Sequence, residues 1–299
     1  MDADALLTLP DGRHVQTWEG GDPRGTPVLF FHGCPDTRHA AMPGHDAARS
    51  AGIRLVAFNR PGYGWSDAAA STHASVADDA AAVADGLRLQ QVAAVGMSIG
   101  GQYALAFAGR HPDRVHAVAA LATPAVIPAL DPPTHRDGLS AQAREELCRL
   151  AALPVGEAME TARPQFEDFV AQVAPDDADD EALTRRWLAM LPAADAALVR
   201  AISTVGEVAA SVREALVQRE GYLRDAALAF REWSVDPRTV RCPVRLWYGE
   251  DDDNVSLRSA RWFAEHLPDA RLVVRPGTGH LATLHRHWDE VLRTVTGER

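Results

Sequence analysis

The 299-residue sequence has 46% hydrophobic and 24% charged residues, which are the proportions of an ordinary soluble globular protein. Its formal net charge of −11 argues against nucleic-acid binding, because nucleic-acid-binding proteins usually present a basic face. The acidic N-terminus does not resemble a signal peptide, and no apolar run reaches the roughly 18 residues that a membrane span needs. The 3 cysteines are far apart and form no CxxC pair, which favours a reduced, cytoplasmic setting and no structural metal. We therefore expect a small-molecule partner rather than nucleic acid or a membrane.

The chain opens with a segment that is typical of a β-hairpin. In ALLTLPDGRHVQTW (residues 5–18), the turn residues PDGR separate two apolar stretches, and these would form antiparallel edge strands. Six short apolar runs follow from Pro27 onward. Their continuous apolar character favours strands that are buried on both faces of a parallel sheet. The six runs are residues 27–33, 53–64, 92–98, 115–124, 243–250 and 270–280.

Segments with helical patterns lie between and after these runs. They are residues 76–87, 99–110, 257–267 and 281–296. Alternation of strand and helix predicts an α/β fold, with a mostly parallel central sheet flanked by helices.

One long interval breaks this alternation. Residues 127–236 contain no convincing strand but several helical stretches interrupted by prolines. We predict a helical insertion there, with a core formed by residues 1–126 and 237–299. Within the insertion, the acidic sequence PDDADDEAL (residues 175–183) is interpreted as a solvated turn and a helix N-terminus rather than a metal site.

The sequence GMSIG (residues 96–100) places Ser98 where an apolar run ends and a helical pattern begins. This arrangement fits a nucleophile elbow, in which flanking glycines leave room for a sharp turn that presents a serine. A serine hydroxyl needs a base, and His280 is the best placed of the 12 histidines because it ends a glycine-built loop after the last apolar run. An acid should precede it in the chain. Run lengths leave four acids open, namely Glu250, Asp251, Asp252 and Asp253.

Oxyanion stabilisation needs backbone N–H groups that point at the developing charge. Ile99 directly follows the serine and would supply one of them. The tight turn HGCP (residues 32–35) follows the first apolar run, and the N–H of Cys34 is the natural second donor. We do not assign Cys34 as a nucleophile, since its own loop offers no histidine–acid pair.

Taken together, these motifs resemble the α/β-hydrolase superfamily over nearly the whole chain. HGCP resembles its oxyanion loop, RPGYGWSD a segment after the following strand, GMSIGG its elbow, and GTGH the segment that carries the base. GEDDDNV resembles the superfamily's G-x-x-D-x-x-V, and this resemblance implies that Asp252 is the acid. The insertion at residues 127–236 corresponds to the superfamily's variable helical cap.

The resemblance implies a serine hydrolase and neither a metal nor an organic cofactor, and the cysteine content and N-terminus favour the cytoplasm as its location. Ser98 would attack a carbonyl group, His280 would act as general base and then general acid, and Asp252 would orient His280. The N–H groups of Cys34 and Ile99 would bind the oxyanion.

Apolar and aromatic side chains of the insertion, Trp187 and Trp233 among them, favour a small, largely apolar ester or lactone as substrate. The same side chains would equally suit the insertion's own core. Two alternative functions stay open. The triad could cleave a carbon–carbon or amide bond, or the fold could serve as a non-enzymatic ligand receptor.

Overall fold

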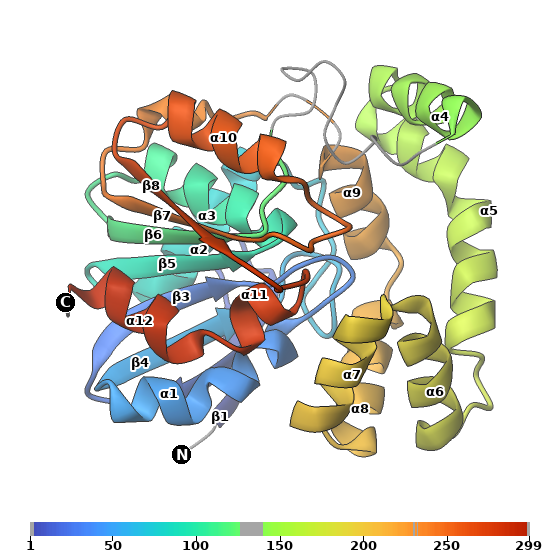
Figure 1. Cartoon of the computed structure of the whole chain (residues 1–299), viewed down its shortest axis with the longest axis horizontal. Helices are drawn as coiled ribbons and strands as arrows, with labels where there is room; N and C mark the ends of the chain where they lie inside the picture. The colour runs from blue at the N-terminus through green and yellow to red at the C-terminus, as the bar shows by residue number, and fades with distance from the viewer. Residues whose placement is uncertain (1–2, 126–139, 230, 232, 298–299) are drawn as a thin grey trace.

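The structure, a computed structural model, describes residues 3–125, 140–229, 231 and 233–297. An eight-stranded sheet lies at its centre, in the order β1-β2-β4-β3-β5-β6-β7-β8 (Figure 1). The β1–β2 and β2–β4 pairs are antiparallel, and the other pairs are parallel. The strands are β1 (Ala3–Thr8), β2 (His14–Gly21), β3 (Thr26–Phe31), β4 (Ile53–Phe58), β5 (Val92–Met97), β6 (Val115–Leu121), β7 (Val244–Gly249) and β8 (Ala270–Arg275). The predicted hairpin and mostly parallel α/β sheet are confirmed.

Helices cover both faces of the sheet. Along β3, Leu29 and Phe31 join an apolar cluster with α2, α3 and α10, whereas Val28 and Phe30 join a cluster with α1 and α12 on the other face. Because neighbouring side chains of a strand point to opposite faces, this division buries both faces of the sheet. The helices that accompany the sheet are η1 (Arg38–Gly44), α1 (His45–Ser50), α2 (His73–Gly86), α3 (Ile99–Arg110), η4 (Pro237–Thr239), α10 (Leu257–His266), α11 (Ala282–His285) and α12 (Trp288–Thr296).

The single helix predicted over residues 281–296 is wrong, because the chain turns at Arg286 and His287 and forms α11 and α12 instead. Only α12 has its buried side chains at helical spacing, from Trp288 to Val295, and it packs these against the sheet. The short α11 follows directly on the loop that carries His280. The turn therefore separates the segment near the site from the helix that covers the sheet.

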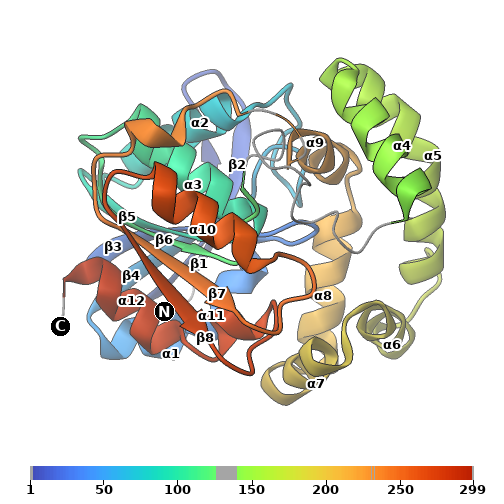
Figure 2. The same cartoon turned by 45° about the horizontal axis from the view of Figure 1, so that its top comes forward.

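Besides the short η4, the described part of the interval between β6 and β7 contains six α-helices and no strand. They gather beside the sheet in both views (Figures 1 and 2), and α5 to α9 share an apolar cluster of their own. They are α4 (Ala141–Ala152), α5 (Val155–Val173), α6 (Asp180–Met190), α7 (Ala193–Ile202), α8 (Val205–Leu216) and α9 (Glu220–Ala229). The predicted start of the insertion at residue 127 lies outside the described residues, so its extent stays a prediction.

The acidic sequence before α6 begins that helix. The Asp179 side chain caps α6 by accepting a hydrogen bond from the Ala182 N–H at 2.7 Å, and Asp180 pairs with Arg213. Both roles suit a helix N-terminus, where negative charge is favoured. No helix in the described part of the chain combines the length and the apolar character that a membrane crossing requires.

Candidate active site

Ser98 occupies a sharp turn between β5 and α3. Its backbone has φ 54° and ψ −129°, a conformation that residues with side chains rarely adopt. The Ser98 N–H donates a hydrogen bond to the Leu121 carbonyl oxygen at 2.8 Å, which ties the turn to β6. A Cβ atom on Gly100 would lie 2.1 Å from the Phe31 carbonyl oxygen, so only glycine fits there. The glycines thus let the turn approach the neighbouring strand closely.

Asp252 and His280 are in direct contact. The His280 Nδ1 lies 2.8 Å from the Asp252 Oδ2, and the Asp252 side chain is fully buried. The other carboxylate oxygen accepts hydrogen bonds from the N–H groups of Asn254 at 2.8 Å and Val255 at 2.9 Å. With Nδ1–H donated to Asp252, the Nε2 of His280 is left to accept a proton. In the part of the chain that the structure describes, no hydrogen bond joins Ser98 to His280.

The three other acids after β7 lie elsewhere. Glu250, Asp251 and Asp253 are exposed, and only Asp252 reaches His280. The Glu250 N–H donates to the carbonyl oxygen of Arg275 at the end of β8, and the Asp251 N–H donates to that of Thr278 in the loop after β8. Run lengths alone could not select among these acids.

The loop after β3 lies against Ser98. A Cβ atom on Gly33 would come within 3.6 Å of the Ser98 Cβ. Over the described residues, the N–H groups of Cys34 and Ile99 donate no hydrogen bond to the protein, and Ile99 opens α3, whose N-terminus carries a partial positive charge. Burial, and then the Asp225 carboxylate, raise the pKa of the Cys34 thiol, which keeps it protonated and weakens it as a nucleophile.

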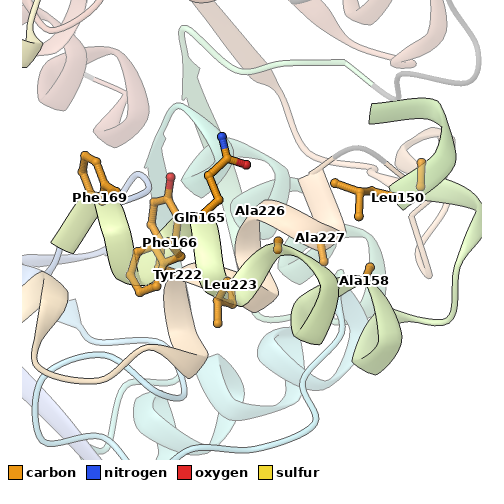
Figure 3. A pocket seen from close by; sticks show the side chains of 11 residues that line it. Leu150, Ala158, Gln165, Phe166, Phe169, Tyr222, Leu223, Ala226 and Ala227 are labelled. Atoms are coloured by element: carbon orange, nitrogen blue, oxygen red, sulfur yellow. The ribbon is translucent and has the colours of Figure 1, made fainter. Parts of the chain in front are cut away.

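A cavity of about 320 Å³ lies between α4, α5 and α9 (Figure 3). Its walls are almost entirely apolar, and the rings of Phe166 and Tyr222 stack there at 4.4 Å. Burial, followed by the Cys34 thiol, raises the pKa of Tyr222. The cavity is lined by Leu150, Ala151, Ala158, Ala162, Gln165, Phe166, Phe169, Tyr222, Leu223, Ala226 and Ala227.

The two tryptophans predicted for a substrate pocket lie in packed clusters. Trp187 packs against the apolar cluster of the insertion. Trp233 is buried and stacks on His73, with ring centres 5.4 Å apart, and it also packs against Phe263. Neither tryptophan lines the cavity, and their contact with substrate stays a prediction.

Sequence reasoning missed three carboxylates that the insertion places against the core, namely Asp195 on α7, Glu214 on α8 and Asp225 on α9. The Asp195 Oδ1 accepts a hydrogen bond from the Leu281 N–H at 3.2 Å, directly beside His280. Burial raises the pKa of Asp195, and His280 acts in the opposite direction. Each of these acids stands alone in a helical stretch, so no motif marked them.

Comparisons with known proteins agree with this architecture. The chain is 28% identical to a pimeloyl-[acyl-carrier protein] methyl ester esterase of Aromatoleum aromaticum, over 81% of this chain and 79% of that protein. It is 30% identical to the protein of the same name from Chromobacterium violaceum, over 77% of this chain and 78% of that protein. Among solved structures, an esterase from Exiguobacterium antarcticum superposes with a TM-score of 0.67 at 19% identity, covering 99% of both chains. The α/β hydrolase fold family matches residues 26–286, and the chain therefore belongs to the α/β-hydrolase family.

Proposed function

We propose that this protein is a serine hydrolase that cleaves a small, largely apolar carboxylic ester or lactone. The observation that carries the proposal is the contact between Asp252 and His280 at 2.8 Å. These residues follow β7 and β8, and Ser98 follows β5, so all three lie at the carboxyl-terminal edge of the parallel strands. The relatives named as methyl ester esterases support ester hydrolysis as the reaction.

In the proposed reaction, the Ser98 Oγ attacks the substrate carbonyl carbon while its proton passes to the His280 Nε2. The carbonyl π electrons move onto oxygen, and the N–H groups of Cys34 and Ile99 stabilise that charge. Collapse of the intermediate breaks the ester bond, and the leaving alcohol takes the proton from His280. Water then attacks the acyl-enzyme and gives its proton to His280, and His280 returns the proton to the Ser98 Oγ as the carboxylic acid leaves. Asp252 orients His280 throughout.

We further propose that residues 127–236 form a cap over this site. Supporting this, the helices α7, α8 and α9 each place a carboxylate against the core: Asp195 contacts Leu281 beside His280, and Glu214 and Asp225 contact Asn59 and Arg60 after β4. The apolar cavity within the insertion suits the apolar part of a substrate. Its volume of about 320 Å³ lies at the lower end of the roughly 300–1,000 Å³ that is usual for small-molecule sites, which suits a small substrate group.

A labelling experiment tests the function. A fluorophosphonate should modify the wild type at Ser98, as shown by peptide mapping, and Ser98→Ala should resist modification and lose ester hydrolysis by orders of magnitude. Esters of graded acyl length, a matched amide and a carbon–carbon bond substrate should then be compared. Ester turnover by folded Ser98→Ala at the wild-type rate would overturn the assignment. Tight ligand binding without turnover would instead favour a receptor.

A further inference from the structure

A buried ionic cluster joins the insertion to the core. Asp225 on α9 is 4% exposed and lies among Arg60, Tyr63 and Tyr103, which together form the Asp225 cluster. Its Oδ2 accepts hydrogen bonds from the Arg60 Nη2 at 2.5 Å and the Tyr63 hydroxyl at 2.8 Å. Its Oδ1 accepts one from the Tyr103 hydroxyl at 2.6 Å. A carboxylate bound this closely on both oxygens holds the guanidinium in one orientation.

The other donors of Arg60 hold the loop after β3. The Arg60 Nη1 donates to the His32 carbonyl oxygen at 2.5 Å, and its Nη2 donates to the Gly33 carbonyl oxygen at 2.8 Å. The His32 Nδ1 lies 2.9 Å from the same Gly33 oxygen. Burial and the Arg60 charge lower the pKa of His32, which keeps the imidazole neutral. Its Nε2 accepts a hydrogen bond from the backbone N–H of Arg60. The Nδ1 therefore carries the proton and donates a hydrogen bond to the Gly33 carbonyl oxygen. Two donors therefore fix one carbonyl group.

The orientation of the Gly33 carbonyl decides the direction of the Cys34 N–H. In a trans peptide, the C=O and N–H bonds of one planar unit point in opposite directions. Arg60 and His32 hold the oxygen on one side of the Gly33–Cys34 unit, and this fixes its N–H on the other side. The loop lies against Ser98, as the 3.6 Å approach at Gly33 shows.

We propose that Asp225 is a positioning residue, which links docking of α9 onto the core to the direction of the Cys34 oxyanion donor. The inference rests on the proposed function. When Asp225 is in place, its carboxylate neutralises the Arg60 charge, and Arg60 keeps the carbonyl oxygens of His32 and Gly33 in position. When that carboxylate is removed or α9 moves away, Arg60 is free to reorient, and the Cys34 N–H loses its alignment. The oxyanion site is then complete only while the insertion is docked.

The test compares two carboxylates of the insertion that contact the core. Asp225→Asn removes the charge from the Asp225 cluster with little change in shape. Glu214→Gln is the matched control, because Glu214 on α8 also docks onto the core, where it accepts hydrogen bonds from Asn59 at 2.8 Å and His39 at 3.2 Å. Its contacts do not include the carbonyl groups that Arg60 holds. Melting temperatures of both variants report any loss of docking.

The readouts are kcat and KM on a small ester and inhibition by a trifluoromethyl ketone. Ser98 adds through its Oγ to the ketone carbon, its proton passes to His280, and the carbonyl electrons form an oxyanion, so this inhibitor reports on the oxyanion donors. Asp225→Asn should lower kcat by roughly 10–10² with KM nearly unchanged, and weaken the inhibitor by a similar factor. Glu214→Gln should leave kcat and the affinity for the inhibitor within about threefold of the wild-type values.

Several outcomes would overturn the inference. Asp225→Asn could retain wild-type kcat and inhibitor affinity, or Glu214→Gln could lose as much of both. If Asp225→Asn does not fold, Tyr103→Phe removes one hydrogen bond from the carboxylate and keeps its charge. This variant should lower kcat and inhibitor affinity together by a few-fold, and unchanged values in it would contradict the proposal. Fluorophosphonate labelling of the wild type at Ser98 is measured in parallel, and its absence would reject the proposed function itself.

Discussion

At the scale of single residues, the acid after β7 offers the sharpest test. Asp252→Asn should lower kcat by about 10²–10⁴, because His280 loses the anion that orients it and favours its correct tautomer. Asp253→Asn is the matched control, since Asp253 is exposed and, of the four acids after β7, only Asp252 forms a hydrogen bond with His280. Steady-state kinetics on one ester, with circular dichroism to verify folding, would check both variants. An equal loss in Asp253→Asn would show that the contact with His280 does not identify the acid.

The side chain of Cys34 should matter much less than its backbone. Cys34→Ala keeps the N–H that is proposed to bind the oxyanion, and it should retain kcat within about threefold of the wild type. The Tyr63 hydroxyl loses its 3.4 Å contact with the thiol but keeps its 2.8 Å hydrogen bond to Asp225. The measurement is kcat on a small ester at neutral pH. A folded but inactive Cys34→Ala would give the thiol a chemical role.

At the scale of secondary-structure elements, the sequence predicted what local patterns encode. The apolar run at residues 92–98 and the helix at residues 99–110 were predicted because strand, turn and helix are consecutive and Ser98 marks their junction. The break between α11 and α12 was missed, since one helical pattern spans it. The contacts of Asp195 and Asp225 could not be predicted, because they depend on how α7 and α9 pack onto distant loops.

The cavity between α4, α5 and α9 provides a prediction at this scale. Ala162→Phe should fill part of the space that Ala162 lines on α5. It should lower kcat/KM for a hexanoate ester relative to an acetate ester by roughly tenfold or more, because the longer chain loses room. Ala171→Phe, on an exposed position of the same helix, is the matched control. Acyl-length profiles of both variants test this, and an unchanged hexanoate-to-acetate ratio in folded Ala162→Phe would place the acyl chain elsewhere.

At the scale of the whole molecule, buried titratable groups link stability to pH. Burial lowers the pKa of His73 to about 4, and it does the same for His285, whose buried Nδ1 has no hydrogen-bond partner among the described residues. Burial has the opposite effect on Asp36, whose pKa rises to about 6. In the unfolded chain these histidines and Asp36 would titrate near 6.5 and 3.8, respectively.

These shifts predict that acidification destabilises the protein between pH 6.5 and pH 4. In that window the unfolded chain binds more protons at His73 and His285 than the folded protein does, so the free energy of unfolding falls as pH falls. From pH 6.5 to 5, each histidine should lower the free energy of unfolding by roughly 1.5 kcal/mol. Asp36 binds its proton more tightly in the folded protein, and it should raise the free energy of unfolding by roughly 1 kcal/mol. The net loss from these three groups is about 2 kcal/mol, and His32, whose pKa is also lowered, acts in the same direction. Urea unfolding at intervals of half a pH unit would measure this loss.

His73→Gln removes one titrating group and should reduce the pH dependence of stability by about the contribution of one histidine. Stability that is constant or rises on acidification would show that these histidines do not stay neutral in the folded protein.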